Sequence, residues 1–190
     1  MSDPPRKSHG RLSINATAKP RDLMTDTPQL KSAWVAKIIT LFPEAFPGTL
    51  GLSLTGKALD TGQWRLEAVD LRQFGEGKHR NVDDTPAGGG AGMVLRPDVM
   101  GRAIAHTQRG VPDDPARWPL VYLSPRGRPF DQATARRYSE AEGITMICGR
   151  FEGMDERVIE HFGIEEVSLG DFVMTGGEIA AQAVMMRPCG

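Results

Sequence analysis

The sequence is poor in cysteine, carries almost no net charge and has no long apolar run. Its two cysteines, Cys148 and Cys189, are too few for a disulfide framework and lack the spacing of a zinc site. We therefore expect a protein of the reducing cytoplasm. The formal net charge of −1 excludes a global basic field of the kind that marks many nucleic-acid-binding proteins, but it leaves a local basic patch open.

No apolar stretch approaches the length that spans a membrane, and the N-terminal residues MSDPPRKSHG offer no apolar segment for a signal peptide. The chain has 190 residues, of which 39% are hydrophobic, so it can bury a globular core. Residues 1–33 are rich in Pro, Ser, Thr and charge and show neither a strand nor a helix period. We expect a flexible tail there, followed by one domain over residues 34–190.

The apolar pattern predicts an α/β fold. Strands are expected at residues 34–42, 64–71, 120–124, 144–148 and 164–170, and helices at 48–62, 96–108, 131–143, 154–163 and 177–186. Asp131 is the expected N-cap of the third helix and Gly143 its expected stop, while residues 72–92 have the composition of a long loop. From residue 120 onward strands and helices alternate, which is typical of a parallel sheet with flanking helices.

Three of the predicted strands are followed by glycine-containing segments, namely SPRGRP (124–129), GRFEG (149–153) and GDFVMTGG (170–177). Ligands of parallel sheets bind beyond the carboxyl ends of the strands, so these segments converge on one site if their strands are neighbours. The sequence has no GxxxxGK[ST] motif, and no GxGxxG motif follows its first strand. A phosphate-binding loop is therefore not favoured.

The side chains of these segments indicate a different kind of ligand. Asp171 and Glu152 would repel a phosphate and would suit a ligand with positive charge or N–H donors. Apolar neighbours could cover a flat heteroaromatic ring that main-chain groups recognise: Leu169, Phe172, Val173 and Met174. A cationic ligand with an adenine ring satisfies both conditions. The alternative is that the glycines are only turn residues and helix stops, and that the two acids are solvated.

A second group of charged residues could form a local basic face for phosphates. The alternative is an ordinary charged surface. The group consists of Arg72, Lys78, His79, Arg80, Asp83, Asp84 and Arg96, with Arg126, Arg128, Arg136, Arg137 and Arg150.

Five segments, in this order, resemble a known family: LFPEAF, HRNVDDTPAGGGAGMVLRPD, YLSPRGRPFDQ, ICGRFEGMDERV and VSLGDFVMTGGEIAA. They look like the bacterial tRNA (guanine-N1)-methyltransferases of the TrmD family over roughly residues 34–185. The resemblance implies methylation of guanine N1 at position 37 of tRNA, with S-adenosylmethionine as the methyl donor, by a cytoplasmic homodimer. It implies a SPOUT-type fold whose C-terminal part forms a trefoil knot, a feature that general topology rules argue against. Mg²⁺ is kept as a second candidate cofactor, and no residues are assigned to a metal site.

The resemblance also implies roles for individual residues. Those expected to bind the methyl donor are Leu123, Ser124, Pro125, Gly149, Leu169, Gly170, Asp171, Phe172, Val173, Met174, Gly176 and Gly177. Glu152, Asp84 and Arg150 are the expected contacts to the base or the donor and form the candidate catalytic set.

In the family, the general base is an Asp in a linker beyond the matched region, followed by a tRNA-binding domain. We therefore expect the chain that ends at Gly190 to be an incomplete version of the enzyme. Two other interpretations stay open. One is a module that binds the donor or RNA without catalysis, and the other is a generic α/β protein that holds a nucleotide's phosphates in its glycine loops.

Overall fold

The structure is a computed structural model that describes residues 33–86 and 88–186. The tail expected at residues 1–33 lies outside the described residues except for its last residue, and Cys189 lies outside them as well. Within the described residues, no helix has both the length and the apolar character needed to cross a membrane. In chain order the elements are β1 (Trp34–Thr40), the 3-10 helices η1 (Pro43–Ala45) and η2 (Gly48–Gly51), α1 (Ser53–Asp60), β2 (Trp64–Asp70), the 3-10 helix η3 (Leu71–Phe74), β3 (Asp83–Asp84), β4 (Val94–Leu95), α2 (Pro97–Thr107), β5 (Leu120–Pro129), α3 (Gln132–Glu140), β6 (Gly143–Cys148), α4 (Glu156–Phe162), β7 (Glu165–Ser168) and α5 (Glu178–Met185).

The prediction of a parallel α/β sheet is confirmed. Five strands form one sheet in the order β2-β1-β6-β5-β7, and every pairing within it is parallel. All six residues of β6 are buried, as expected for a central strand that is covered on both faces. Because β6, β5 and β7 are neighbours, their carboxyl ends lie along one edge of the sheet.

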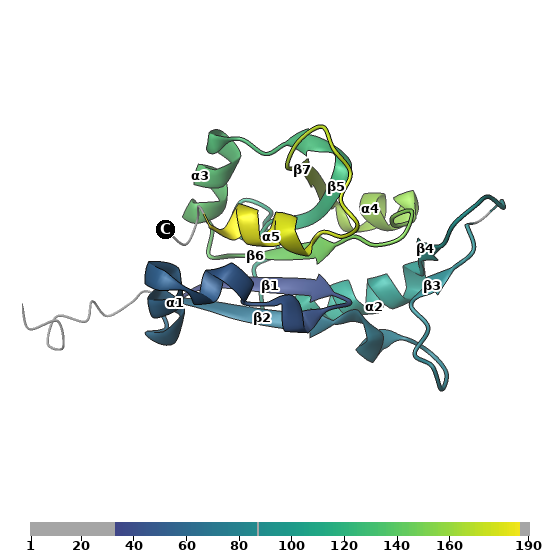
Figure 1. The fold of residues 1–190 in the computed structure, drawn as a ribbon, viewed down its shortest axis with the longest axis horizontal. Helices are drawn as coiled ribbons and strands as arrows, with labels where there is room; N and C mark the ends of the chain where they lie inside the picture. Colours follow the sequence, from purple (N-terminus) through teal and green to yellow (C-terminus); the bar gives the residue numbers. More distant parts are fainter. Residues whose placement is uncertain (1–32, 87, 187–190) are drawn as a thin grey trace, which may run out of the picture. The chain divides into compact units, whose positions relative to one another are not determined.

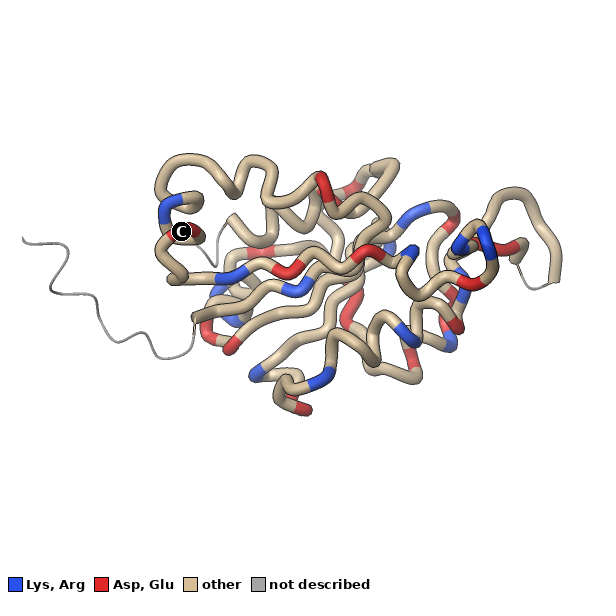
Figure 2. The backbone as a smooth tube through the Cα atoms, turned by 90° about the horizontal axis from the view of Figure 1, so that it is seen from below, with Lys and Arg blue, Asp and Glu red and all other residues tan. Residues whose placement is uncertain are grey.

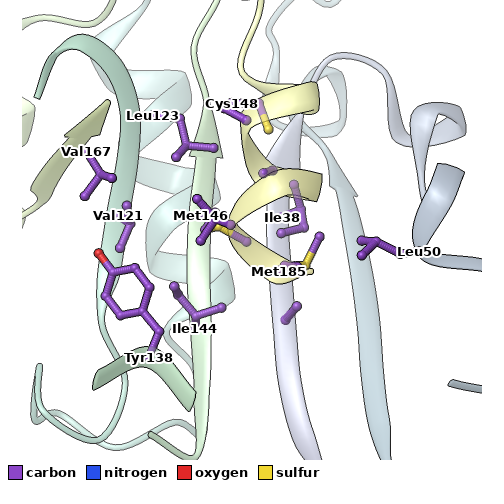
Figure 3. Close-up of a cluster of buried hydrophobic side chains, with 14 of the residues drawn as sticks. Ile38, Leu50, Val121, Leu123, Tyr138, Ile144, Met146, Cys148, Val167 and Met185 are labelled. Carbon is purple, nitrogen blue, oxygen red and sulfur yellow. The ribbon is translucent and has the colours of Figure 1, made fainter. Parts of the chain in front are cut away.

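Helices cover both faces of this sheet (Figure 1). On one face, α3, α5 and η2 pack over Ile38, Met146 and Val121, and Met185 of α5 lies against the strands (Figure 3). On the other face, α2 and α4 pack over Ile39 and the remaining alternate side chains of the strands. Alternate residues of each strand therefore belong to two different cores, which explains the continuous apolar runs in the sequence.

β5 differs from its prediction because it does not end at Ser124. It pairs with β7 up to Leu123, and after an irregularity it pairs again from Arg128, both residues being opposite Val167. The four residues in between, 124–127, bulge out of the strand. Pro125 is tolerated there because its missing N–H is not needed for hydrogen bonding between strands. The segment expected to be a loop at 124–129 is thus partly strand.

Three smaller differences have local causes. Gly143 does not stop a helix; it begins β6, where an added Cβ would lie 2.5 Å from the Val35 carbonyl oxygen, and α3 already ends at Glu140. The helix expected at 48–62 is broken into η2 and α1 at Ser53, whose φ is +54°. The loop at 72–92 contains η3 and the strand β3, which pairs with β4 in a short antiparallel ribbon. The Asp131 N-cap is confirmed, because its carboxylate accepts the Thr134 N–H at 2.7 Å.

Gly101 lies inside α2, and replacing it with alanine should stabilise the protein. Its added Cβ would meet only the Phe162 ring, at 3.8 Å, which is ordinary van der Waals contact. Alanine also removes the entropic disadvantage of glycine within a helix, so we expect a gain of about 0.5–1 kcal/mol in the free energy of unfolding. Urea denaturation measures this, and a lower midpoint for Gly101→Ala would contradict the packing described for α2 and α4.

Candidate functional site

A cavity of about 290 Å³ lies at the carboxyl ends of β5, β6 and β7. Its walls are the β5 bulge, the segment 149–153 that follows β6, and the segment between β7 and α5. The three glycine-containing segments of the sequence therefore do meet around one space, as their strand order requires.

Main-chain hydrogen bonds fix the walls relative to one another. The Gly177 N–H donates to the Gly149 carbonyl at 3.2 Å and joins the start of α5 to the end of β6. After β7 the chain turns sharply, since the Ser168 hydroxyl accepts the Gly170 N–H at 3.2 Å and donates to the Gly170 carbonyl at 2.9 Å. The cavity is therefore shaped by backbone, and few of its walls depend on long flexible side chains.

Most of the residues expected to bind the methyl donor line this cavity. They are Leu123, Ser124, Pro125, Gly149, Leu169, Gly170, Phe172, Val173, Met174, Gly176 and Gly177. Glu152 and Arg150 of the candidate catalytic set line it too. Asp171 is exposed and is not among the lining residues.

Asp84 also lies away from the cavity lining. It is an exposed residue of β3, and its carboxylate accepts the Thr85 N–H at 2.8 Å. The β3–β4 ribbon is nevertheless tied to the segment 149–153, because Leu95 N–H donates to the Gly153 carbonyl and Glu152 N–H donates to the Met93 carbonyl, both at 2.9 Å. Asp84 thus belongs to an arm that leads into the cavity wall.

Glu152 is the acidic residue among those that line the cavity. It is exposed, and within the described residues its carboxylate makes no hydrogen bond or ion pair. Gly92 packs against it, since an added Cβ there would lie 2.5 Å from the Glu152 Cγ. Its carboxylate is therefore free to accept N–H donors of a ligand.

Arg150, by contrast, is engaged with the protein. Its Nη1 donates to the Thr175 carbonyl and its Nη2 to Glu178 Oε2, each at 3.0 Å, and its guanidinium lies 4.4 Å from the centre of the Phe42 ring. Glu178 is buried and also accepts the Thr40 hydroxyl at 2.8 Å. No sequence motif signals this contact, because Thr40 and Glu178 are 138 residues apart.

Several lining residues were absent from the sequence-based set, namely Tyr122, Arg126, Phe151, Gly153, Val167, Ser168, Thr175 and Ala180. Most are direct chain neighbours of expected residues, so widening each motif by one or two positions would have included them. Phe151 carries a further structural sign, a φ of +59° in a region that side chains rarely adopt. Strain of this kind clusters at binding sites.

Two apolar side chains at the cavity are unusually exposed. Phe172 is 57% and Val173 82% exposed, although both lie on a segment that is otherwise held by the fold. Exposed apolar surface beside a cavity is typical of a ligand-binding site. Together with the uncovered Glu152 carboxylate, it suits a ligand with a flat ring and N–H donors or positive charge.

Some members of the expected basic face pair with acids. Arg96 pairs with Glu76 and Asp98, Arg126 with Glu156 and Glu166, and Arg128 and Arg137 with Glu165. Basic and acidic residues are accordingly interspersed along the chain (Figure 2). Arg72, Lys78, His79 and Arg80 make no ion pair within the described residues, so the choice between a phosphate-binding face and an ordinary charged surface stays a prediction. The described residues include no group of three or more His, Cys, Asp or Glu that could hold a metal ion.

Cys148, at the end of β6, should resist alkylation in the folded protein. Burial raises the pKa of its thiol well above the ordinary value, and the nearby Glu178 charge raises it further. Since the thiolate is the reactive form, we expect iodoacetamide at pH 8 to modify Cys148 at least ~10-fold more slowly than in the urea-unfolded chain. Mass spectrometry of the Cys148 peptide distinguishes it from Cys189. Equal rates in both states would contradict the burial of this thiol.

The chain matches known proteins over almost all of the described region. A family model described as tRNA (Guanine-1)-methyltransferase TrmD matches residues 35–187. A tRNA (guanine-N(1)-)-methyltransferase of Ruegeria pomeroyi is 68% identical over 162 residues, which is 85% of this chain and 65% of that protein. Proteins with the same name from Cereibacter sphaeroides strain KD131 and Rhodospirillum rubrum are 68% and 53% identical and cover 82% and 79% of this chain. The chain thus spans somewhat less than two thirds of the length of these relatives.

Proposed function

This chain belongs to the tRNA (guanine-1)-methyltransferase TrmD family, and from that premise we propose that it methylates guanine N1 at position 37 of tRNA with S-adenosylmethionine as the donor. The observation that supports this most directly is the cavity at the carboxyl ends of β5, β6 and β7. Residues 34–190 are proposed as the donor-binding domain. A SPOUT-type trefoil knot over its C-terminal part is proposed from family membership, and the cytoplasm from the substrate.

The lining of the cavity fits the proposed donor. An adenine ring can be covered by Leu169, Phe172 and Met174 and recognised by main-chain groups of the three segments, while a sulfonium is compatible with a wall that presents carbonyl oxygens and few cationic groups. When bound, the donor supplies the methyl group. The role of the protein is to hold the methyl carbon of the donor in line with guanine N1, about 3–3.5 Å apart, and to exclude water from both.

The second requirement is a proton acceptor, because guanine N1 carries a proton at neutral pH. A positioned general base contributes typically ~10²–10⁴-fold to such a step. Of the acids in the candidate set, Glu152 lines the cavity with a free carboxylate. We propose that this carboxylate accepts hydrogen bonds from the N–H groups of the guanine. Asp84 lies on the arm beside it and is proposed as a second substrate contact. Arg150 is proposed to shape the site, because its donors are already engaged by Thr175 and Glu178.

Two measurements test the proposal together. Calorimetry should detect binding of S-adenosylhomocysteine but not of ATP, since the sequence has no GxxxxGK[ST] motif and the Glu152 carboxylate in the cavity lining would repel a phosphate. Tritiated S-adenosylmethionine should label an unmodified tRNA transcript with guanine at position 37 and leave a transcript with adenine at that position unlabelled. Binding of ATP alone would favour the generic nucleotide-binding interpretation, and donor binding without labelling of either transcript would favour a module without catalysis.

We also propose that the protein is a homodimer, as implied by its family. Four large apolar side chains are exposed on α5 and on the region of η2 and α1 that packs beside it: Leu52, Leu54, Ile179 and Met186. Ile179 is 69% exposed, and a second copy of the chain would cover it. Light scattering should give the mass of a dimer, and Ile179→Glu should lower it to that of a monomer. A monomeric wild-type protein at high concentration would exclude the dimer.

A further inference from the structure

A chain of buried and half-buried polar side chains connects the carboxyl end of β1 to the cavity. It begins at Thr40, the last residue of β1, which is 1% exposed and donates to Glu178 Oε1 at 2.8 Å. Glu178 is the first residue of α5 and is 6% exposed; its other oxygen accepts Arg150 Nη2 at 3.0 Å. Arg150 then donates to the Thr175 carbonyl. The chain therefore ends on two of the three segments that line the cavity.

We propose that Glu178, oriented by Thr40, is a positioning residue for methyl-donor binding: it holds Arg150 so that the segments 149–153 and 170–177 keep a fixed separation. This inference rests on the proposed function for the identity of the ligand. Glu178 is not itself among the residues that line the cavity, and it acts through Arg150. Sequence motifs would not single it out, because its role depends on a contact with Thr40 across the fold.

Neighbouring residues confine the Arg150 guanidinium on two sides. The guanidinium is held against the Phe42 ring, and an added Cβ at Gly176 would collide with it and would lie 2.5 Å from Glu178 Oε2. The Arg150 Nε is buried without a hydrogen-bond partner in the described residues. Since Glu178 provides the one ion pair that Arg150 makes there, a neutral residue at 178 leaves a half-buried cation held only by the Thr175 carbonyl and the Phe42 ring. Such a cation turns toward solvent, and the cavity is the open space that it lines.

The alternative is that the polar chain only stabilises the fold. Thr145 supplies a matched control, because it is also a buried strand threonine, fully covered, and it accepts hydrogen bonds from Trp118 Nε1 at 2.9 Å and Gln108 Nε2 at 3.2 Å. It lies on β6 but is not part of the cavity lining. Thr145→Val should therefore lose stability without changing the cavity, whereas Thr40→Val should change both.

The experiment compares Glu178→Gln, Thr40→Val, Thr40→Ser and Thr145→Val by calorimetric titration with S-adenosylhomocysteine, at a temperature where each variant is folded. We expect the dissociation constant to rise about 10-fold in Glu178→Gln, which loses the negative charge that pairs with Arg150, and about threefold in Thr40→Val, which loses the hydrogen bond that orients Glu178. Thr40→Ser should restore the wild-type value, and Thr145→Val should stay within about twofold of it despite a lower melting temperature. Combining Glu178→Gln with Arg150→Met should add little to the effect of Arg150→Met alone.

Amide hydrogen exchange of the ligand-free proteins provides a second readout. Exchange in residues 149–153 and 170–177 should be faster in Glu178→Gln and Thr40→Val and unchanged in Thr145→Val. If the Thr40→Val and Glu178→Gln variants lose melting temperature but keep the wild-type affinity within about twofold, as expected of the Thr145→Val control, the positioning role is wrong. If the wild-type protein binds no S-adenosylhomocysteine, the proposed function fails, and the exchange data alone decide whether the polar chain holds the two segments. Should Glu178→Gln not fold, the comparison of Thr40→Val with Thr40→Ser decides whether the positioning role holds.

Discussion

Gly127→Val should be among the most destabilising single substitutions in this protein and should abolish donor binding. Gly127 closes the bulge of β5, where the main chain passes so near β7 that an added Cβ would collide with the Val167 amide and lie 2.5 Å from the Glu166 carbonyl carbon. These are backbone atoms of a paired strand, so they cannot move aside as a flexible side chain would. We expect a loss of about 3 kcal/mol or more in the free energy of unfolding.

The same substitution displaces Ser124 and Pro125, which form one wall of the cavity. Urea denaturation and calorimetry with S-adenosylhomocysteine measure the two effects. Gly101→Ala is the matched control, because it adds a Cβ where space exists and should change stability in the opposite direction. A Gly127→Val protein with wild-type stability would show that β5 does not return to β7 after the bulge.

Gly177→Val should block donor binding for a reason that differs from the usual one for glycine. The φ of Gly177 is −82°, so its backbone conformation is open to any residue. The constraint is space: an added Cβ would lie 2.8 Å from the Cys148 Cα and 3.1 Å from the Gly149 nitrogen. A side chain forces α5 away from the end of β6 and breaks the hydrogen bond from Gly177 to Gly149.

Because the first added carbon causes the clash, Gly177→Ala should already weaken binding of S-adenosylhomocysteine, by roughly 10-fold or more, and valine should weaken it further. The comparison with alanine separates a steric effect from a conformational one. Unchanged affinity in a folded Gly177→Val protein would mean that this junction does not support the site.

The sequence was informative wherever a signal is local. The apolar run ITMIC predicts a strand, Asp131 predicts a helix start, and alternation after residue 120 predicts a parallel sheet; all three are confirmed. Periodicity does not reveal the strand order, yet the topology rule for parallel sheets was enough to expect the three glycine segments around one space.

What the sequence could not reveal depends on contacts between distant segments. The pattern YLSPRGRP suggests that a strand stops at proline, and only the partner strand β7 shows that the chain bulges and resumes pairing. Arg150 was expected to contact a ligand because the family resemblance implied it, whereas its protein partners Thr175 and Glu178 lie far from it in the sequence and are set by the fold. Asp84 and Asp171 were included by motif, and the structure puts both outside the lining of the cavity.

The pairing of β1 has a consequence for the order in which the molecule can assemble. In the sheet, β1 lies between β2, which is the next strand along the chain, and β6, which pairs with it from Gly143 onward. During synthesis β1 and β2 must wait, with one edge of β1 unpaired, until the ribosome has released β6. The hydrogen bond between Thr40 and Glu178 closes later still. Such long-range closure is slow and leaves an aggregation-prone edge, so we expect chaperone dependence to last from the release of β1 until β6 has left the ribosome.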